Sequence, residues 1–332
     1  MPSSERIRPI RATTPRTPPV TFVLALHDGR AGNVRQALTL AKTLHANPGN
    51  LTLVPRLPWR WSAPRRLPAA EHAFAGSFAQ HLTSPPAIAV GCGRQAALAT
   101  RLLRERGSRV VQILAPRIDT HHWDLVVAPR HDRLEGDNVI SMLGSLNPID
   151  DAWLLRARAA FPALAALPAP HTVLLLGGPT RHAPLRDGEV ARVLHMLSER
   201  ARAEGGSFSA IASRRTPPAW LAAMGQVDHW IPGTRWRDTG DGANPYAGLL
   251  AHASRIVCTP DSVNMLSEAA ATPAPVFVWR PEATSGRVRT FIESLQDSGR
   301  VRTLDDAMAP FACTPLRETA RISALVRERL AL

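Results

Sequence analysis

The sequence has almost no lysine and little cysteine. Among its 332 residues Lys42 is the only lysine, and Cys92, Cys258 and Cys313 lie far apart. A phosphate-binding P-loop needs a glycine before its lysine, and Lys42 follows Ala41, so a P-loop nucleotidase is excluded. Three scattered cysteines form neither a disulfide framework nor a zinc signature, a pattern typical of a protein in a reducing cytoplasm.

Several catalytic motifs are also missing. The sequence contains no H-E-x-x-H, G-x-S-x-G or C-x-x-C motif, so zincins, hydrolases with a nucleophile elbow and thioredoxin-like enzymes lose support. It also lacks the Asp-x-Asp pair that holds a divalent metal against a sugar nucleotide in one class of glycosyltransferases. We therefore expect no metal site and no cofactor, and any sugar transfer to be metal-independent.

No apolar run approaches the roughly 20 residues that a membrane-spanning helix needs. The first 20 residues are basic and rich in Pro, Ser and Thr, without the apolar stretch of a secretory signal. We interpret residues 1–20 as a flexible basic tail and expect a cytoplasmic protein.

The net charge of +13 would ordinarily suggest a nucleic-acid partner. The arginines are spread along the chain instead of forming a run, so we expect no nucleic-acid binding. Phosphate-bearing ligands, or a peripheral contact with the inner face of an anionic membrane, fit this charge better.

Short β-rich runs alternate with glycine-containing turns and helical patterns along most of the chain. This alternation predicts an α/β fold with parallel sheets. A proline-rich stretch at 161–171 interrupts it, and the pattern then restarts. We predict two Rossmann-like domains facing a cleft, at 21–165 and 171–312, and a C-terminal helix over 313–332 packed back on the body.

In the first domain two strand-end turns carry candidate chemistry. Asp28 could take a proton from an acceptor hydroxyl, and His131 could shuttle one. The plain alternatives are a turn, a helix cap or a surface loop. The candidates are Asp28 and His131 as catalytic residues, and Gly29, Arg30, Gly32, Asn33 and Asp132 on the acceptor side.

In the second domain three turns suit a nucleotide diphosphate. Glycine N–H groups and arginines would supply donors to the phosphates. Glu268 falls on one helix face with Asp261 if Thr259 caps that helix, and a carboxylate there would suit a ribose diol. Tight turns and a solvated helix face are the plain alternatives. The candidates are Gly177, Gly178, Thr180, Arg181, Ser213, Arg214, Thr259, Asp261, Ser262 and Glu268.

A third glycine turn, Gly91 to Ala96, fits the dinucleotide fingerprint. The fingerprint also needs an acid at the end of the next strand, where this chain has Ala115, Pro116 and Arg117. Close packing of a helix on a strand is therefore favoured over an NAD site.

Five segments together resemble the elongated-mitochondria fission-factor family. They read DGRAGNVRQALTLAKTL, GCGRQAALATRLLR, DLVVAPRHDRLEGDNVI, LLGGPTRH and DSVNMLSEAAATPAPVFVW, and they span about Thr21 to about Trp279 in this order. Bacterial members of the family are described as candidate glycosyltransferases, and plant members are known for mitochondrial division through a dynamin-related partner. The resemblance implies the two-domain architecture called GT-B.

The last segment also looks like the donor signature of nucleotide-sugar transferases. Carried over, that likeness implies that Ser262 and Glu268 hold the nucleotide, that Gly177 and Gly178 lie by the diphosphate, and that Asp28 to Gly32 face the acceptor. This chain has Pro273-Ala274-Pro275 where the family often has Gly-Lys-Pro, which changes only the turn before the next strand.

The leading hypothesis is a metal-independent GT-B glycosyltransferase that uses a nucleotide-diphosphate sugar, with a cell-envelope glycan or lipid as the acceptor. The alternatives are a nucleotide-sugar 2-epimerase and a non-catalytic scaffold of fission type. The sugar, the acceptor, the stereochemical outcome and the oligomeric state stay open at this point.

Overall fold

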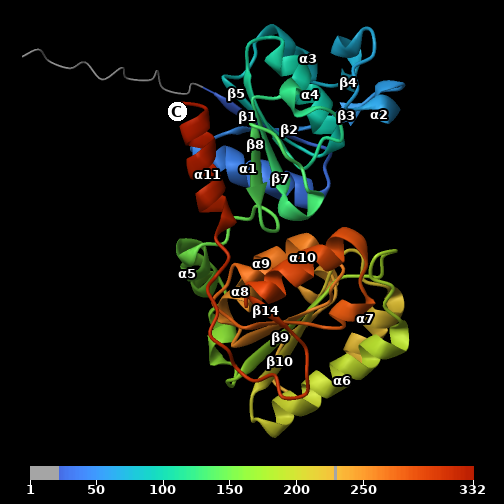
Figure 1. The fold of residues 1–332 in the computed structure, drawn as a ribbon. Helices are drawn as coiled ribbons and strands as arrows, with labels where there is room; N and C mark the ends of the chain where they lie inside the picture. Colours follow the sequence, from blue (N-terminus) through green and yellow to red (C-terminus); the bar gives the residue numbers. More distant parts are fainter. Residues whose placement is uncertain (1–21, 228–229) are drawn as a thin grey trace, which may run out of the picture.

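A computed structural model describes residues 22–227 and 230–332. The predicted tail at 1–20 lies outside the described residues. The chain forms two halves, each built on a six-stranded parallel sheet, stacked one above the other (Figure 1). This confirms the predicted α/β fold with two Rossmann-like domains.

The first sheet has the order β2-β1-β5-β6-β7-β8. All five residues of β1, VLALH, are buried, as expected where helices cover both faces of a parallel sheet. Its strands are β1 (Val23–His27), β2 (Gly49–Thr52), β5 (Ile88–Cys92), β6 (Arg109–Ile113), β7 (Leu125–Pro129) and β8 (Val139–Met142). Its helices are α1 (Ala31–Leu44), α3 (Phe78–Thr83) and α4 (Arg94–Arg104).

A small excursion leaves the first half between β2 and α3. It holds an antiparallel pair, β3 (Val54–Pro55) with β4 (Phe74–Ala75), and the short helix α2 (Trp59–Ser62). These elements lie at the edge of the first half opposite α11 (Glu318–Arg329) (Figure 1).

The second sheet has the order β11-β10-β9-β12-β13-β14. Its strands are β9 (His171–Leu176), β10 (Ser207–Ala212), β11 (Arg235–Trp236), β12 (Arg255–Cys258), β13 (Val276–Val278) and β14 (Val301–Thr303). Its helices are α6 (Asp187–Ala203), α7 (Pro218–Gly225), α8 (Tyr246–His252), α9 (Val263–Ala270) and α10 (Gly286–Asp297). Short 3₁₀ turns occur at Ala70–His72, Thr120–His122, Arg130–Asp132 (η3), Pro162–Ala166, Thr239–Asp241 and Pro281–Ala283.

The chain crosses between the halves earlier than the sequence predicted. Helix α5 (Asp151–Ala160) and Leu164 pack into the core of the second half, with Leu249 and Leu250. The proline-rich stretch at 161–171 is therefore part of the second half, and the crossing lies between β8 and α5. Prolines indicate a break in regular structure, but they do not indicate with which half the neighbouring helix packs.

The C-terminal helix returns to the first half, as predicted. Ile322 and Val326 of α11 are fully buried in the core that also holds Leu40 of α1, and α11 lies beside α1 in Figure 1. The helix begins at Glu318, so the predicted range of 313–332 was too long. In the described part of the chain, no helix has both the length and the apolar character needed to cross a bilayer.

The buried His171 on β9 predicts a loss of stability in acid. Burial lowers the pKa of its imidazole to about 4, and the charge of His252 adds to the decrease. Because the unfolded chain binds the proton more tightly, with a pKa near 6.5, stability contributed by neutral His171 is present above pH 6.5 and is lost as pH falls toward 4.

The parent protein should lose unfolding free energy when the pH is lowered from 7 to 5. In His171→Gln we expect this loss to be smaller by about 2 kcal/mol. Urea unfolding of both proteins at the two pH values measures it. His195→Gln, on the exposed face of α6, is the control and should keep the parent's pH dependence. An unchanged loss in His171→Gln would show that other groups cause the acid sensitivity.

Candidate functional site

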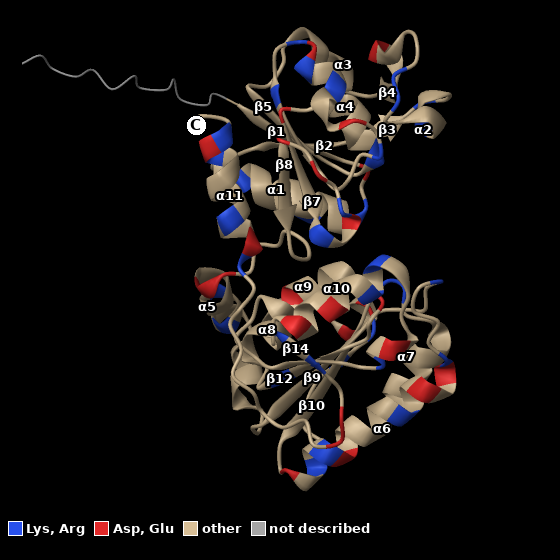
Figure 2. Ribbon diagram, in the orientation of Figure 1, with Lys and Arg blue, Asp and Glu red and all other residues tan. Residues whose placement is uncertain are grey.

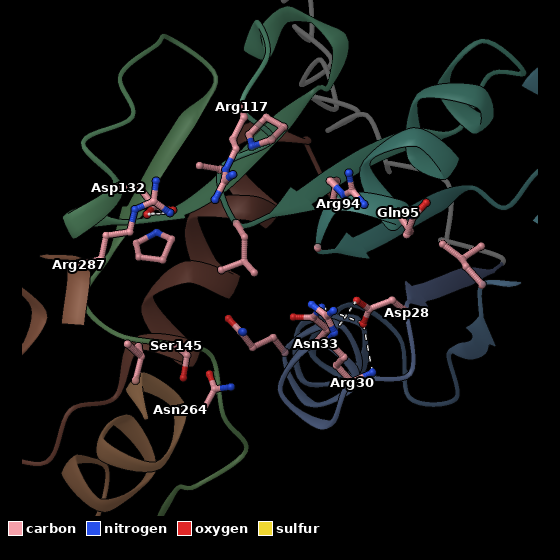
Figure 3. A pocket seen from close by; sticks show the side chains of 18 of the residues that line it. Asp28, Arg30, Asn33, Arg94, Gln95, Arg117, Asp132, Ser145, Asn264 and Arg287 are labelled. Atoms are coloured by element: carbon pink, nitrogen blue, oxygen red, sulfur yellow. Dashed lines mark hydrogen bonds and ion pairs between the residues drawn. The ribbon is translucent and has the colours of Figure 1, made fainter. Parts of the chain in front are cut away.

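A cavity of about 860 Å³ lies where the two halves meet. Most of its walls come from the carboxyl ends of the first sheet's strands, and α9 and α10 of the second half close it (Figure 3). Its polar lining residues are Asp28, Arg30, Asn33, Gln36, Arg60, Arg94, Gln95, Arg117, His131, Asp132, Ser145, Asn264 and Arg287.

The sheet topology explains why the cavity forms here. In open parallel sheets, ligands bind beyond the carboxyl ends of the strands, where the strand order reverses. In the first half that point lies between β1 and β5. Asp28 follows β1 and Gly93 follows β5, and both residues line the cavity.

Asp28 is held in a fixed position by its own turn. Its Oδ1 accepts hydrogen bonds from Asn33 Nδ2 at 2.9 Å and from the backbone N–H of Arg30 at 3.1 Å. The guanidinium of Arg30 lies 3.6 Å from Oδ2. The side chain keeps 18% exposure, so a carboxylate oxygen remains accessible to a ligand in the cavity.

His131 and Asp132 stand on another wall, on the 3₁₀ turn η3. Burial lowers the pKa of His131, and its neighbours Asp132 and Arg287 act in opposite directions on it. The ring is therefore neutral near pH 7 and can accept a proton. Asp132 faces Arg287 of α10 at ion-pair distance, 2.9 Å, so this acid joins the two halves. Figure 3 shows Asp132 and Asp28 on opposite sides of the cavity.

The structure thus brings together the first-domain residues that the sequence singled out. Asp28, Arg30, Asn33, His131 and Asp132 all line one cavity. Gly29 lies in the same turn, with φ of 80°. Gly32 differs in role, because a Cβ there would meet Asn264 Nδ2 at 2.0 Å. It lets α1 approach α9 closely.

Sequence reasoning missed most of the cavity's arginines, because it named only Arg30 among the candidates. Five arginines line the cavity, against two carboxylates. Within residues 22–227 and 230–332, neither Arg60 nor Arg117 has a side-chain partner. Two strained residues, Leu114 with φ of 73° and Arg117 with φ of 62°, border the cavity after β6. Left-handed backbone at non-glycine residues costs about 1 kcal/mol or more and gathers at ligand sites.

Two buried amide side chains of the cavity wall have no partner for their oxygen among residues 22–227 and 230–332. Gln36 is 3% exposed and Gln95 is 8% exposed, and Oε1 of each has no hydrogen bond. Since Gln95 Nε2 donates to Arg60 O at 2.9 Å, its amide orientation is fixed. A buried acceptor without a donor is costly, so a ligand that carries hydroxyl or amide N–H groups would suit this wall.

The equivalent crevice of the second half is filled by its own side chain. It lies between β9 and β12, and the carboxylate of Asp261, with no exposed area, occupies it. Asp261 accepts from Arg215 at 2.6 Å, from Thr259 Oγ1 at 2.7 Å and from the Gly178 N–H at 3.1 Å. Thr259 in turn accepts from the Gly177 N–H at 2.8 Å.

These contacts correct the prediction that the Gly177 and Gly178 N–H groups are open to a diphosphate. A Cβ at Gly177 would lie 2.1 Å from the Asp261 oxygens, and one at Gly178 would lie 2.1 Å from Arg215 O. The two glycines therefore admit Asp261 and the Arg215 backbone. Thr259 is not a helix cap either, because Ser262 is the N-cap of α9.

The other donor-side candidates lie outside the cavity. Thr180 bridges to Ala183 in a tight turn, and Arg181 Nε contacts His182. The turn from Ser213 to Arg215 is exposed except at Ser213, which is half-buried. None of Thr180, Arg181, Ser213, Arg214 and Ser262 lines the cavity, although Val263 and Asn264, which follow Ser262, do.

Glu268 lies at the boundary between the halves, but it does not line the cavity. It is 3% exposed. It forms an ion pair with Arg35 of α1 and accepts a hydrogen bond from Tyr246 Oη at 2.5 Å. Both carboxylate oxygens are therefore occupied by protein groups.

We expect Asp261→Ala to lower the free energy of unfolding by about 3 kcal/mol, because it leaves Arg215, Thr259 and a buried N–H without their acceptor. Asp28 is partly exposed, so Asp28→Ala should lower the free energy of unfolding by only about 1 kcal/mol or less. Chemical denaturation measures the unfolding free energy of both variants. Equal losses of stability in Asp261→Ala and Asp28→Ala would mean that the two crevices do not differ as described.

Glu268→Ala is expected to destabilise the protein by about 2 kcal/mol in the absence of any nucleotide. Glu293→Ala, which removes an exposed partner of Arg289, is the matched control and should change stability by about 0.5 kcal/mol or less. Thermal or urea unfolding measures both. A Glu268→Ala protein with the parent's stability and weakened nucleotide binding would restore the ribose-binding interpretation.

Solved structures share this architecture. The UDP-GlcNAc 2-epimerase of Methanocaldococcus jannaschii aligns with a TM-score of 0.56 over 92% of this chain and 100% of its own, at 13% identity. At that identity the likeness shows the fold alone, which is of the GT-B type.

Sequence relatives extend over most of the chain. The mitochondrial fission protein ELM1 of Arabidopsis thaliana is 30% identical over 281 residues, covering 74% of this chain, and the chain spans only 64% of the length of that relative. An uncharacterized protein of Rickettsia prowazekii (strain Madrid E) is 23% identical over 93% of this chain and 99% of its own length. Residues 31–330 match the family model described as Mitochondrial fission ELM1. The chain therefore belongs to the mitochondrial fission ELM1 family.

Proposed function

We propose that the protein is a glycosyltransferase that moves a sugar from a nucleotide diphosphate to an acceptor in the cavity between its halves, without a metal ion. One observation carries the proposal: a fixed carboxylate, Asp28, and a neutral imidazole, His131, line one cavity together with unpaired guanidinium groups. A sugar transfer needs a proton acceptor and a cationic environment for the departing diphosphate.

The cationic environment would come from both halves. Arg60 and Arg117 of the first half have no side-chain partner in the part of the chain that the structure describes, and Arg287 reaches in from α10. Backbone N–H groups at the N-terminus of α9, next to Ser262, would add partial positive charge. A diphosphate bound among these groups would have its developing charge neutralised as the sugar leaves.

The proton acceptor would be Asp28 in the first instance. Asn33 and the turn backbone hold its carboxylate, so little reorganisation is needed when the acceptor hydroxyl arrives. His131 is the second candidate, because burial keeps its imidazole neutral and able to accept a proton. The unpaired oxygens of Gln36 and Gln95 would accept from sugar hydroxyl or amide groups.

The nucleoside would lie toward the second half. Thr180, Arg181, Ser213 and Arg214 occupy its strand-end turns and remain candidates for contacts with the base or ribose. Glu268, Asp261, Gly177 and Gly178 take no direct part in this proposal, since protein groups already occupy their polar atoms.

A 2-epimerase acting on a nucleotide sugar is the second candidate, favoured by the fold shared with the UDP-GlcNAc 2-epimerase. Incubation with UDP-GlcNAc alone separates the two, since an epimerase changes the sugar without an acceptor and a transferase does not. A non-catalytic scaffold remains the third candidate, because the plant relative is named a mitochondrial fission protein. It would bind a protein and leave the cavity without nucleotide.

Nucleotide binding is the first test. We expect one of UDP, GDP or CMP to raise the melting temperature, and Arg117→Ala to weaken that nucleotide's affinity about tenfold, since a hydrogen bond to a charged group contributes about 1.5 kcal/mol or more. Arg156→Ala, on the exposed surface of α5, is the matched control. No stabilisation by any of the three, or equal affinity in both variants, contradicts the proposal.

Turnover is the second test. Asp28→Asn should lower the rate of nucleotide release from the sugar donor by about 10²-fold or more, the range for a lost general base, while nucleotide affinity stays within about threefold of the parent. His131→Gln, assayed alongside, identifies the base if Asp28→Asn retains activity. A loss of affinity equal to the loss of rate would assign Asp28 to binding instead.

A further inference from the structure

Most of the exposed large hydrophobic side chains in the described part of the chain fall in one short segment. These exposed side chains are Val54, Leu57, Trp61, Leu155 and Trp230. Three of these five fall within eight residues, and Trp61 is 72% exposed. Single exposed apolar residues are normal on a soluble surface, but a cluster marks an interaction site. We call residues 54–66, which run from β3 through α2, the β3–α2 segment.

The same segment is strongly basic. It contains four exposed arginines, Arg56, Arg60, Arg65 and Arg66, and no acidic residue. Arg66 pairs with Glu105 at 3.0 Å. Across the described ranges of the chain, Arg56, Arg60 and Arg65 have no ion-pair partner. Figure 2 shows blue Lys and Arg positions on the ribbon near β3.

The protein holds this segment firmly although Val54, Leu57 and Trp61 are exposed. Arg94 donates to the carbonyls of Arg60 and Trp61, at 3.1 and 3.2 Å, and Gln95 donates to the first of them at 2.9 Å. Arg101 Nη1 donates to Pro64 O at 2.6 Å. Three side chains of α4 thus fix the backbone, so the exposure of Leu57 and Trp61 does not come from a loosely held loop.

We propose that the β3–α2 segment docks the protein on an anionic phospholipid bilayer. An exposed tryptophan with an exposed leucine four residues before it suits the boundary between headgroups and acyl chains, where indole rings concentrate. Unpaired arginines complement headgroup phosphates, each contributing about 1 kcal/mol near a charged membrane. Because the backbone is already ordered, little conformational entropy is lost on docking.

Docking in this way would place the cavity at the membrane surface. Val54, Pro55 and Arg60 belong both to the segment and to the cavity wall. A ligand anchored in the bilayer could then extend its polar group directly into the cavity. The docking surface itself does not depend on sugar transfer, so the two proposals can fail separately.

Vesicle co-sedimentation of the full chain tests the surface. We expect binding to phosphatidylcholine vesicles that contain phosphatidylglycerol, weaker binding at high salt, and little binding to phosphatidylcholine alone. The double variant Leu57→Ser with Trp61→Ser should bind the vesicles at least tenfold more weakly, because it removes the apolar side chains that would be buried in the bilayer. Arg56→Ser with Arg65→Ser should weaken binding about tenfold or more.

Leu155→Ser is the matched control, since Leu155 is 66% exposed on α5, outside the segment. It should bind vesicles as the parent does. Far-UV circular dichroism and nucleotide-induced thermal shifts check that the segment variants remain folded with an intact cavity. The proposal is overturned if the parent does not sediment with anionic vesicles, or if both segment variants bind them as well as Leu155→Ser does. Equal binding to neutral vesicles would overturn the role of the arginines.

Discussion

The placement of α9 between the two halves is the constraint on which the rest of the structure depends. Glu268 is buried there against Arg35 of α1 and Tyr246 of α8. Ser267 Oγ accepts the Ser145 N–H at 3.0 Å, and a Cβ at Gly144 would lie 2.5 Å from the same oxygen. The helix therefore fixes the approach of the halves, and its first turn becomes a wall of the cavity. An unpaired Glu268 in that position would cost several kcal/mol, which makes the ion pair a condition for the closed arrangement.

The two halves share a fold but use their strand-end crevices differently. In the first half the crevice stays open. It is bordered by strained residues, unpaired arginines and two amide oxygens without donors. In the second half Asp261 fills the crevice and accepts hydrogen bonds from two different loops, from the Gly178 N–H and from Arg215. The sequence shows the same pattern of strand, small residues and polar residues in both places, so it predicts both turns as sites. Only the partner of each polar group decides between a ligand site and an internal clamp.

Sequence patterns were sufficient where the determinants are local. Apolar runs, glycine turns and helix periodicity predicted the α/β halves, and position at strand ends predicted the gathering of Asp28, Arg30, Asn33, His131 and Asp132. They were insufficient where partners are distant, since Arg35 and Glu268 lie 233 residues apart. The net charge also did not show which arginines bind ligands and which stabilise the fold. Arg300, 3% exposed, donates to four carbonyls at and beyond the C-terminus of α9, so part of the positive charge is structural.

The closed arrangement limits how a ligand can enter the cavity. Rotation of the halves about their junction would break the ion pair of Glu268 with Arg35, and the Arg287–Asp132 pair bridges the halves again at η3. Entry past the first half avoids both costs, because Val54 and Arg60 border the cavity and are exposed. The arginines near that rim, unpaired by protein groups, would attract an anionic ligand along this route. The clamp at α9 and the basic rim therefore favour one direction of approach, from the side on which the β3–α2 segment lies.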